Sequence, residues 1–138
     1  MKLKIYTDGA LRRRKNLLGA WCYLLLEPKK AVIEAKIETA ANITNNRMEV
    51  TAVINALKAC PPNSEVELYT DSQYVVYGAA EGIQKTNVDL WRQFNNAVKD
   101  NHLTLKVEHV YGHQNDQGNN AVDLTMRRML DLVIKKTE

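Results

Sequence analysis

Residues 2–10, KLKIYTDGA, and residues 65–72, EVELYTDS, hold the pattern from which the architecture of this chain follows. In both stretches apolar and polar residues alternate up to an aspartate, which is Asp8 in the first and Asp71 in the second. Such alternation is typical of a β-strand with one buried face. A turn-forming or hydroxyl residue follows each aspartate, so we expect each strand to end there with a carboxylate at its carboxyl end.

The period of the apolar residues divides the rest of the chain into further strands and helices. We expect the strand before Asp71 over residues 65–70, the other strands at residues 20–27, 31–39 and 103–110, and three of the helices at residues 72–80, 88–100 and 119–136. A further helix is expected with Thr44 or Asn45 as its N-cap and Pro61-Pro62 as its stop, and Asn87 is a candidate cap for the helix over residues 88–100. Three strands in succession, followed by strands alternating with helices, predict an α/β fold with a mixed sheet covered on both faces.

Composition places the chain among ordinary globular proteins. Its 138 residues are 45% hydrophobic and 25% charged, which suits one domain over residues 1–138. We see no long apolar span and no signal segment, and therefore expect no membrane association and a cytoplasmic location. Cys22 and Cys60 are expected to be reduced thiols, although the sequence leaves a disulfide between them open. The net charge of +3 permits a polyanionic partner without requiring one.

Two further acids belong to the expected helices. Glu49 lies within the first helix, and Asp123 lies in the last, ten positions after His113. Hard cations such as Mg²⁺ take oxygen ligands, and two cations about 4 Å apart require several carboxylates from different elements. We therefore expect these two acids to converge with the two strand-end aspartates on a site for Mg²⁺.

Four consecutive bases follow the first aspartate, namely Arg12, Arg13, Arg14 and Lys15. They form either a solvated loop or a phosphate-binding group, and the sequence leaves both interpretations open. Two other basic pairs, at residues 29–30 and 135–136, are most simply solvated turn and tail residues.

Four motifs occur in a fixed order along the chain. They are YTDGA at residues 6–10, TNNRME at 44–49, YTDSQYV at 69–75, and Gly112-His113 followed by Asn119 and Asp123. In these motifs and their spacing the chain resembles ribonuclease H of type 1 over residues 2–129, in a variant without the basic arm that many bacterial relatives carry. The resemblance implies a five-stranded mixed sheet of order 3-2-1-4-5, in which the two strand-end aspartates are neighbours.

The resemblance also implies an activity: an endonuclease that hydrolyses the RNA strand of RNA–DNA hybrids and leaves 5′-phosphate and 3′-hydroxyl ends. Two Mg²⁺ ions, or Mn²⁺ in their place, would serve it. Asp8 would bridge both ions and Asp71 would bind the ion on the side of the attacking water. Glu49 and Asp123 would bind the ion on the leaving-group side. His113 would handle a proton or assist product departure, although an exposed histidine without a role is the alternative. The other histidines are expected to have no role.

Recognition of the RNA strand is implied for three amide side chains, Asn45, Asn46 and Gln73. Each can donate and accept hydrogen bonds, as contact with RNA 2′-hydroxyls in the minor groove requires. Helix capping is the alternative role for Asn45, and turn polarity is the alternative for Gln73.

Recognition of phosphates is implied for three other residues. Thr44 and Arg47 match a pocket for a phosphate of the DNA strand, unless Arg47 pairs with a helix acid instead. Asn119 either caps the last helix or contacts the phosphate at the scissile site.

The chain departs from its relatives in two places. Only residues 79–87, with the single base Lys85, span the gap where many bacterial relatives insert the basic arm. Residues 12–19 stand where the loop usually holds an Asn-Pro-Gly turn, so Asn16 is given no role. We hypothesise that the four bases of residues 12–15 partly replace the missing arm.

Two rival functions remain. The first is another nuclease or a strand-transfer enzyme on the same fold, since a fold does not fix a reaction. The TNNRME motif and Gln73 argue against it. The second is a hybrid-binding module with an inactive site, against which the presence of all four acids argues. A monomer is the default expectation.

Overall fold

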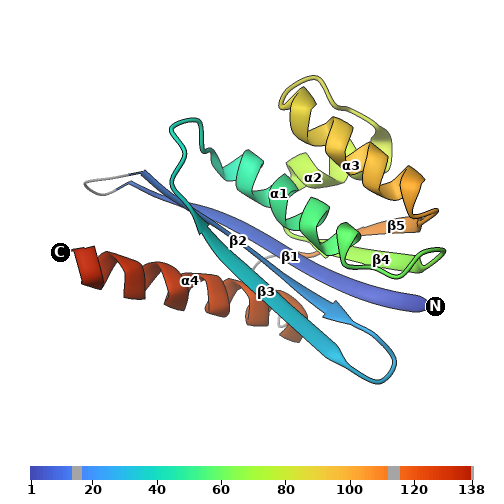
Figure 1. Ribbon diagram of the computed structural model, residues 1–138, viewed down its shortest axis with the longest axis horizontal. Coiled ribbons are helices and arrows are strands. Elements are labelled where there is room, and N and C mark those ends of the chain that lie inside the picture. Colours follow the sequence, from blue (N-terminus) through green and yellow to red (C-terminus); the bar gives the residue numbers. More distant parts are fainter. Residues whose placement is uncertain (14–16, 112–115, 138) are drawn as a thin grey trace.

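The computed structural model describes residues 1–13, 17–111 and 116–137 (Figure 1). Within these ranges the elements follow one another in the order β1 (Lys2–Arg13), β2 (Leu17–Leu26), β3 (Ala31–Glu38), α1 (Asn45–Lys58), β4 (Glu65–Thr70), α2 (Gln73–Glu81), α3 (Val88–Asp100), β5 (Thr104–His109) and α4 (Gln117–Thr137). None of the helices in these ranges is both long enough and apolar enough to cross a membrane.

The five strands form one mixed sheet in the order β3-β2-β1-β4-β5. β1 pairs antiparallel with β2, and β2 pairs antiparallel with β3. β4 lies parallel to both β1 and β5. The strand order and the mixed character implied by the resemblance are therefore confirmed.

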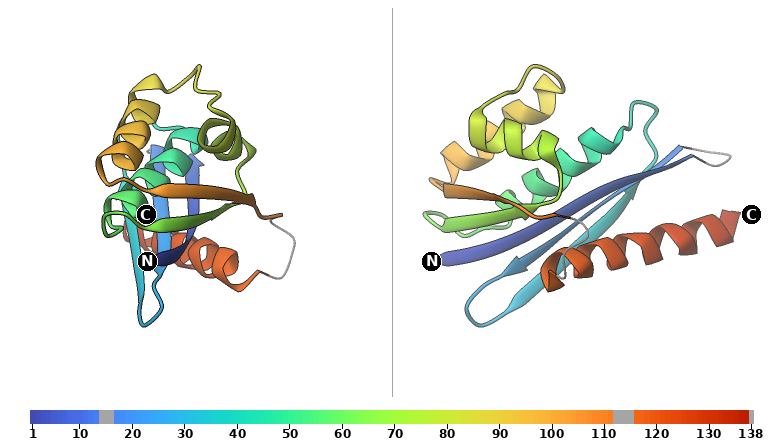
Figure 2. Two further views of the ribbon diagram at one scale, coloured as in Figure 1. Left: turned by 90° about the vertical axis from the view of Figure 1, so that its right-hand side faces the viewer. Right: turned by 180° about the vertical axis from the view of Figure 1, so that it is seen from behind.

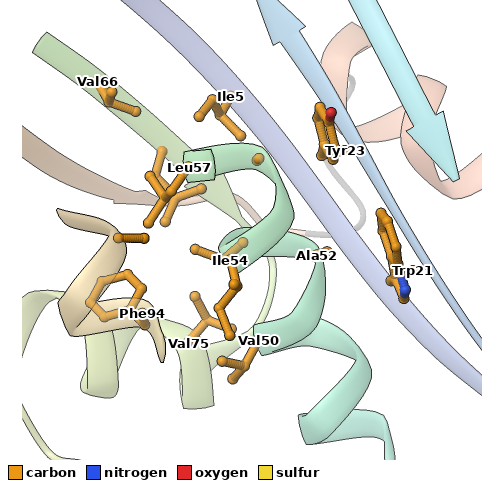
Figure 3. Close-up of a cluster of buried hydrophobic side chains, with 14 of the residues drawn as sticks. Ile5, Trp21, Tyr23, Val50, Ala52, Ile54, Leu57, Val66, Val75 and Phe94 are labelled. Atoms are coloured by element: carbon orange, nitrogen blue, oxygen red, sulfur yellow. The ribbon is translucent and has the colours of Figure 1, made fainter. Parts of the chain in front are cut away.

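Helices cover both faces of the sheet, as expected. Figure 2 shows α1, α2 and α3 on one face and α4 on the other. The larger core fills the space under α1 and α3, where Leu57, Leu68 and Trp91 are almost fully buried. Figure 3 shows this core, with side chains of α1 meeting those of the strands and of α3. Each fully buried leucine contributes about 1.5–3 kcal/mol to the free energy of unfolding.

A smaller core lies under α4. Val122, Met126 and Leu130 recur at helical spacing along α4 and pack against Ala20 and Cys22 of β2. Both cysteines of the chain are buried free thiols, so the alternative of a disulfide between them is not realised. α4 is thus fixed to the sheet along one apolar stripe, which sets the direction of its other side chains.

The expectation that the first strand ends at Asp8 is wrong. β1 continues to Arg13, and β2 pairs with it from Lys4 through Arg13. On its other side β1 pairs with β4 only as far as Tyr6. Asp8 therefore lies just beyond the point where β1 loses its β4 neighbour, inside a long hairpin rather than at a strand end. Arg12 and Arg13, expected in a loop, belong to this hairpin.

Candidate metal centre and nucleic-acid surface

Three acids from three elements meet where β1 parts from β4. Asp8 comes from β1, Glu49 from α1, and Asp71 directly follows β4. One carboxylate oxygen of each lies within 4.8 Å of the others. Asp8 and Glu49 are only 5% and 8% exposed, so the meeting point is largely shielded from water. The structure thus brings together three of the four acids expected to converge.

The close approach of α1 to β1 depends on Gly9. A Cβ atom on Gly9 would lie 2.4 Å from the backbone nitrogen of Glu49 and 2.5 Å from the carbonyl carbon of Met48. Neither backbone atom can move aside without shifting the helix. The missing side chain of Gly9 is therefore what allows Glu49 to reach Asp8 across the sheet.

Burial and mutual repulsion raise the pKa values of all three carboxyls. Burial, followed by the charge of Asp71, raises the pKa of Asp8 to about 7. Burial, followed by the charges of Asp8 and Asp71, raises the pKa of Glu49 well above its ordinary value. Burial also raises the pKa of Asp71. Without a cation the cluster therefore retains protons near neutral pH.

A divalent cation fits this cluster chemically. Oε2 of Glu49 is buried and has no hydrogen-bond partner in the described part of the chain. A buried oxygen without a donor is costly unless something positive meets it. Carboxylate oxygens are the ligands that Mg²⁺ and Ca²⁺ prefer, and the three acids supply them from rigid elements.

Asp123, the fourth expected acid, is not a member of this cluster. Its Oδ2 accepts hydrogen bonds from Nε of Arg127, at 3.1 Å, and from Nη2 of the same residue. It is still close enough that its charge contributes to the raised pKa values of Asp8 and Asp71. Asp123 thus lies at the edge of the cluster, paired with a base that the sequence interpretation had not considered.

The acids line a hollow of about 650 Å³, called the acidic hollow below. Its wall also carries amides, a hydroxyl and two bases. Besides the four acids these polar side chains are Arg12, Asn45, Asn46, Ser72 and Arg127. The acidic hollow thus offers donors for a polyanion beside ligands for a cation.

The two amides of this wall, Asn45 and Asn46, are exposed in the first turn of α1. Thr44 is the N-cap, because its Oγ1 accepts a hydrogen bond from the backbone N–H of Arg47 at 3.1 Å. The alternative of a capping role for Asn45 is therefore wrong. Gln73, the first residue of α2, is also exposed.

Arg47 pairs with an acid, but the acid belongs to another helix. Its guanidinium donates to both carboxylate oxygens of Asp89 on α3, at 3.0 and 2.7 Å, and to Oδ1 of Asn87 at 3.1 Å. Asn87 in turn donates to the hydroxyl of Tyr74. Asn87 is the N-cap residue of α3, as expected, and its backbone carbonyl accepts hydrogen bonds from the N–H groups of Leu90 and Trp91, but its side chain makes no capping hydrogen bond. Arg47 and Asn87 are 40 positions apart, so the local sequence around either residue could not indicate the contact between them.

The start of α4 is organised by Asp116 rather than by Asn119. The carboxylate of Asp116 accepts a hydrogen bond from the backbone N–H of Asn119 at 3.0 Å, and its carbonyl accepts one from the backbone N–H of Asn120. Asn119 itself is buried at 5% exposure in the second position after the helix begins. Capping, one of the two roles expected for Asn119, is therefore performed by the side chain of Asp116.

Gly118 allows α4 to begin this close to the sheet. A Cβ atom on Gly118 would lie 2.4 Å from ring carbons of Tyr6. The Tyr6 ring is itself stacked on Tyr69 of β4, with centroids 4.8 Å apart. This aromatic pair supports the first turn of the helix that carries Asp123.

Three expected site residues, His113, Arg14 and Lys15, lie outside the described residues. Another histidine, given no role from the sequence, does lie beside the cluster. Nε2 of His109 is 3.3 Å from the carbonyl oxygen of Asp71, and its ring packs edge-on against Tyr111. The parallel pairing of β4 with β5 produces this contact, so no local pattern could have indicated it.

Comparison with known proteins gives a consistent result. The RNase H family model matches residues 1–130. Ribonuclease H of Albidiferax ferrireducens is 33% identical over 150 aligned residues, which cover 97% of each chain. Ribonuclease H of Caldicellulosiruptor saccharolyticus is 34% identical, over 91% of this chain and 94% of that protein. Ribonuclease H of Thermosynechococcus vestitus is 38% identical, over 91% of this chain and 86% of that protein.

Proposed function

Because this chain belongs to the ribonuclease H family, and is by that membership an endoribonuclease, we propose that it hydrolyses the RNA strand of RNA–DNA hybrids at the acidic hollow. The proposed products carry 5′-phosphate and 3′-hydroxyl ends. One observation carries the proposal: Asp8, Glu49 and Asp71 come from three elements and present oxygens within 4.8 Å of one another.

The three acids are proposed to hold divalent cations, with Asp8 shared between two of them. The shared role is given to Asp8 by likeness to the family, and the mutual closeness of the three oxygens, all within 4.8 Å of one another, is compatible with it. Asp123, which lines the same acidic hollow, is proposed as a further ligand. When bound, a pair of Mg²⁺ or Mn²⁺ ions supplies Lewis-acid stabilisation of the attacking and leaving oxygens.

The chain's own residues must bring a phosphodiester up to a cluster of negative charge. Arg12 and Arg127 line the same hollow as the acids and oppose that repulsion. His113 is proposed to move a proton at the departing oxygen or to assist the release of the product.

Recognition of the RNA strand is proposed for Asn45, Asn46 and Gln73. All three are exposed, and each follows the N-cap of a helix that begins beside the cluster, Thr44 for α1 and Ser72 for α2. Amides in this position can exchange hydrogen bonds with 2′-hydroxyls on either side of the scissile bond. Base identity has little influence on such contacts.

Phosphate contacts are proposed for Thr44, Arg47 and Asn119. The ion pair with Asp89 holds the Arg47 guanidinium at the junction of α1 and α3, and Asn87 adds an amide to the same group. A DNA phosphate there would share the guanidinium with Asp89. Asn119 is proposed for contact with the scissile phosphate on the family motif alone, since it is buried and is not among the residues that line the acidic hollow.

The proposal is tested by cleavage of labelled substrates. Hybrid, duplex RNA, duplex DNA and single-stranded RNA are incubated with Mg²⁺ or EDTA, and the ends of the products are mapped. We expect cutting of the RNA strand of the hybrid alone, dependent on Mg²⁺. The Asp71→Asn variant should lose cleavage by about 100-fold or more while keeping its fold and its hybrid binding.

Each rival function has its own outcome in this assay. Cutting of duplex DNA would favour another nuclease on the same fold. Binding of hybrid without cleavage, in Mg²⁺ as in Mn²⁺, would favour an inactive binding module. Asp100→Asn, at the exposed end of α3, serves as the matched control, because it makes the same chemical change away from the acidic hollow.

We also infer that the enzyme works as a monomer in the cytoplasm. All three clustered acids come from one chain, so a single copy holds a complete cluster. Cys22 and Cys60 are free thiols, as is usual for proteins of a reducing compartment. Sedimentation of the protein with and without hybrid tests the first inference.

A further inference from the structure

Arg127 is paired with one of the four acids expected at the site. It lies one helical turn after Asp123 on α4, and its Nε and Nη2 both donate to the Asp123 carboxylate. It also lines the acidic hollow. The next residue, Arg128, lines a different hollow on the outside of α4, beside Asp131 and Lys135. Two adjacent arginines thus face different surroundings.

The ion pair affects which acids are available to a cation. Asp8, Glu49 and Asp71 form a group with mutual oxygen separations within 4.8 Å, and Asp123 is outside that group. Its Oδ2, the atom that receives both donors of Arg127, is already engaged. A carboxylate that is neutralised by a guanidinium is a poor ligand for a second cation.

The same guanidinium is well suited to a phosphate. Planar guanidinium groups bind carboxylates and phosphates through the same paired N–H donors. The side chain of Arg127 is 61% exposed and that of Asp123 is 36% exposed. An exposed ion pair of this kind is weak and exchanges readily. A nucleic-acid phosphate that enters the acidic hollow can therefore compete with Asp123 for Arg127.

We propose that Arg127 is a positioning residue that holds Asp123 away from the cation cluster until a phosphate of the hybrid draws the guanidinium to itself. The proposal rests on the proposed function, because it takes a nucleic acid as the competing polyanion. Arg127 then couples two binding events: hybrid binding frees Asp123 as a ligand, and cation binding at Asp123 frees Arg127 for phosphate. Such coupling is reciprocal by thermodynamic necessity.

The first test measures cation binding without nucleic acid. Mn²⁺ is titrated calorimetrically into the wild type, Arg127→Ala, Arg127→Lys and Arg128→Ala. We expect Arg127→Ala to bind Mn²⁺ about three-fold or more tightly than the wild type, because Asp123 is released. Arg127→Lys should remain near the wild type, since it keeps the charge, and Arg128→Ala should match the wild type.

The Asp123→Asn background separates an effect through Asp123 from a general loss of positive charge. If Arg127 acts through Asp123, the gain caused by Arg127→Ala disappears when Asp123 is Asn. A gain that persists in this background contradicts the proposal. Equal Mn²⁺ binding by Arg127→Ala and Arg128→Ala also contradicts it.

The second test measures hybrid binding in EDTA by fluorescence anisotropy, where no cation is present. Arg127→Ala should weaken binding several-fold more than Arg128→Ala does. It should also make the fall of log K with log salt less steep, by about 0.7–0.9 in slope. Equal weakening by both variants would contradict the phosphate contact. Failure of the wild type to cut hybrid would reject the proposed function, whereas the Mn²⁺ titrations judge the link between Arg127 and Asp123 independently.

Discussion

At the level of single residues, Asp8 shows the electrostatic cost of forming this site. Its carboxyl is buried beside two other acids, and its pKa is raised to about 7. The ionised cluster therefore destabilises the folded chain when no cation is present. The residues of the site are placed for binding rather than for stability.

The unfolding free energy in EDTA should accordingly depend on pH through Asp8. A carboxyl whose pKa is higher in the folded than in the unfolded state stabilises the fold below about pH 4, and this stability is lost as the pH rises through about 7. Asp8→Asn removes that loss. We expect the variant to exceed the wild type in stability by on the order of 2 kcal/mol at pH 8, and by less at pH 4.

Urea unfolding in EDTA at several pH values between 4 and 8 measures this difference. Asp100→Asn is the matched control, since that residue is exposed at the end of α3 and far from the acid cluster in sequence. A difference between wild type and Asp8→Asn that stays constant over this range would contradict the electrostatic account of the cluster.

At the level of elements, the contact of α4 with the sheet decides where Asp123 lies. Gly118→Ala should disturb this contact, because the new Cβ would meet the Tyr6 ring at 2.4 Å. We expect a loss of about 1–3 kcal/mol in unfolding free energy. We also expect a fall in kcat measured well below the melting temperature, since the first turn of α4 moves with Asn119 and Asp123.

Gly82→Ala separates the two effects. Gly82 has φ +70°, so alanine is strained there, but no atom lies within 4 Å of the added Cβ. This variant should lose stability by about 1 kcal/mol while its kcat stays unchanged. Similar kcat values for the two glycine variants would show that the position of α4 does not matter to the reaction.

The elements themselves were largely predictable, because their apolar periods are clear. The helix over residues 88–100 and the strand over residues 65–70 were expected with the bounds that the structure has. The end of β1 was not, since the alternation fades after Asp8 and only pairing with β2 extends the strand to Arg13. Pairing is a tertiary fact that local sequence does not carry.

The site was predictable where motifs carry it and unpredictable where the fold brings distant residues together. Asp8, Glu49 and Asp71 were expected to converge, and the structure places them together. The pairing of Asp123 with Arg127 follows from helical spacing, four positions apart, but competes with the role of a metal ligand. The approach of His109 to Asp71 depends on strand pairing alone.

At the level of the whole molecule, the hairpin of β1 and β2 extends past the ends of β4 and β5 (Figure 1). It carries Arg12, which lines the acidic hollow, and Arg13, which is exposed. A basic projection beside the acid cluster is a suitable place to hold the backbone of a long polyanion. The places of Arg12 and Arg13 agree with the hypothesis that the bases of residues 12–15 partly replace the missing arm; the other two bases, Arg14 and Lys15, lie outside the described residues.

Neutralising all four bases of residues 12–15 should therefore weaken hybrid binding and flatten its salt dependence. Each lost phosphate contact should make the fall of log K with log salt less steep, by about 0.7–0.9 in slope. Anisotropy titrations between 50 and 200 mM salt, the range over which such contacts change affinity most visibly, measure both quantities.

A matched pair of double variants controls for net charge. Arg12→Gln with Arg13→Gln is compared with Lys29→Gln and Lys30→Gln, which remove the same charge from the turn between β2 and β3. Figure 1 shows that turn at the opposite end of the sheet from the basic projection. Equal losses of affinity in the two pairs would mean that the hypothesis of a replacement arm is wrong.

Catalysis as proposed requires that Asp8 of β1, Glu49 of α1 and Asp71, which directly follows β4, hold a divalent cation. Anomalous diffraction from crystals grown with Mn²⁺ tests this most directly. We predict an anomalous peak within about 2.0–2.4 Å of carboxylate oxygens of Asp8, Glu49 and Asp71, and its loss in crystals of Asp71→Asn. Crystals of the wild type with ordered Mn²⁺ elsewhere, but no peak among these three side chains, would contradict it.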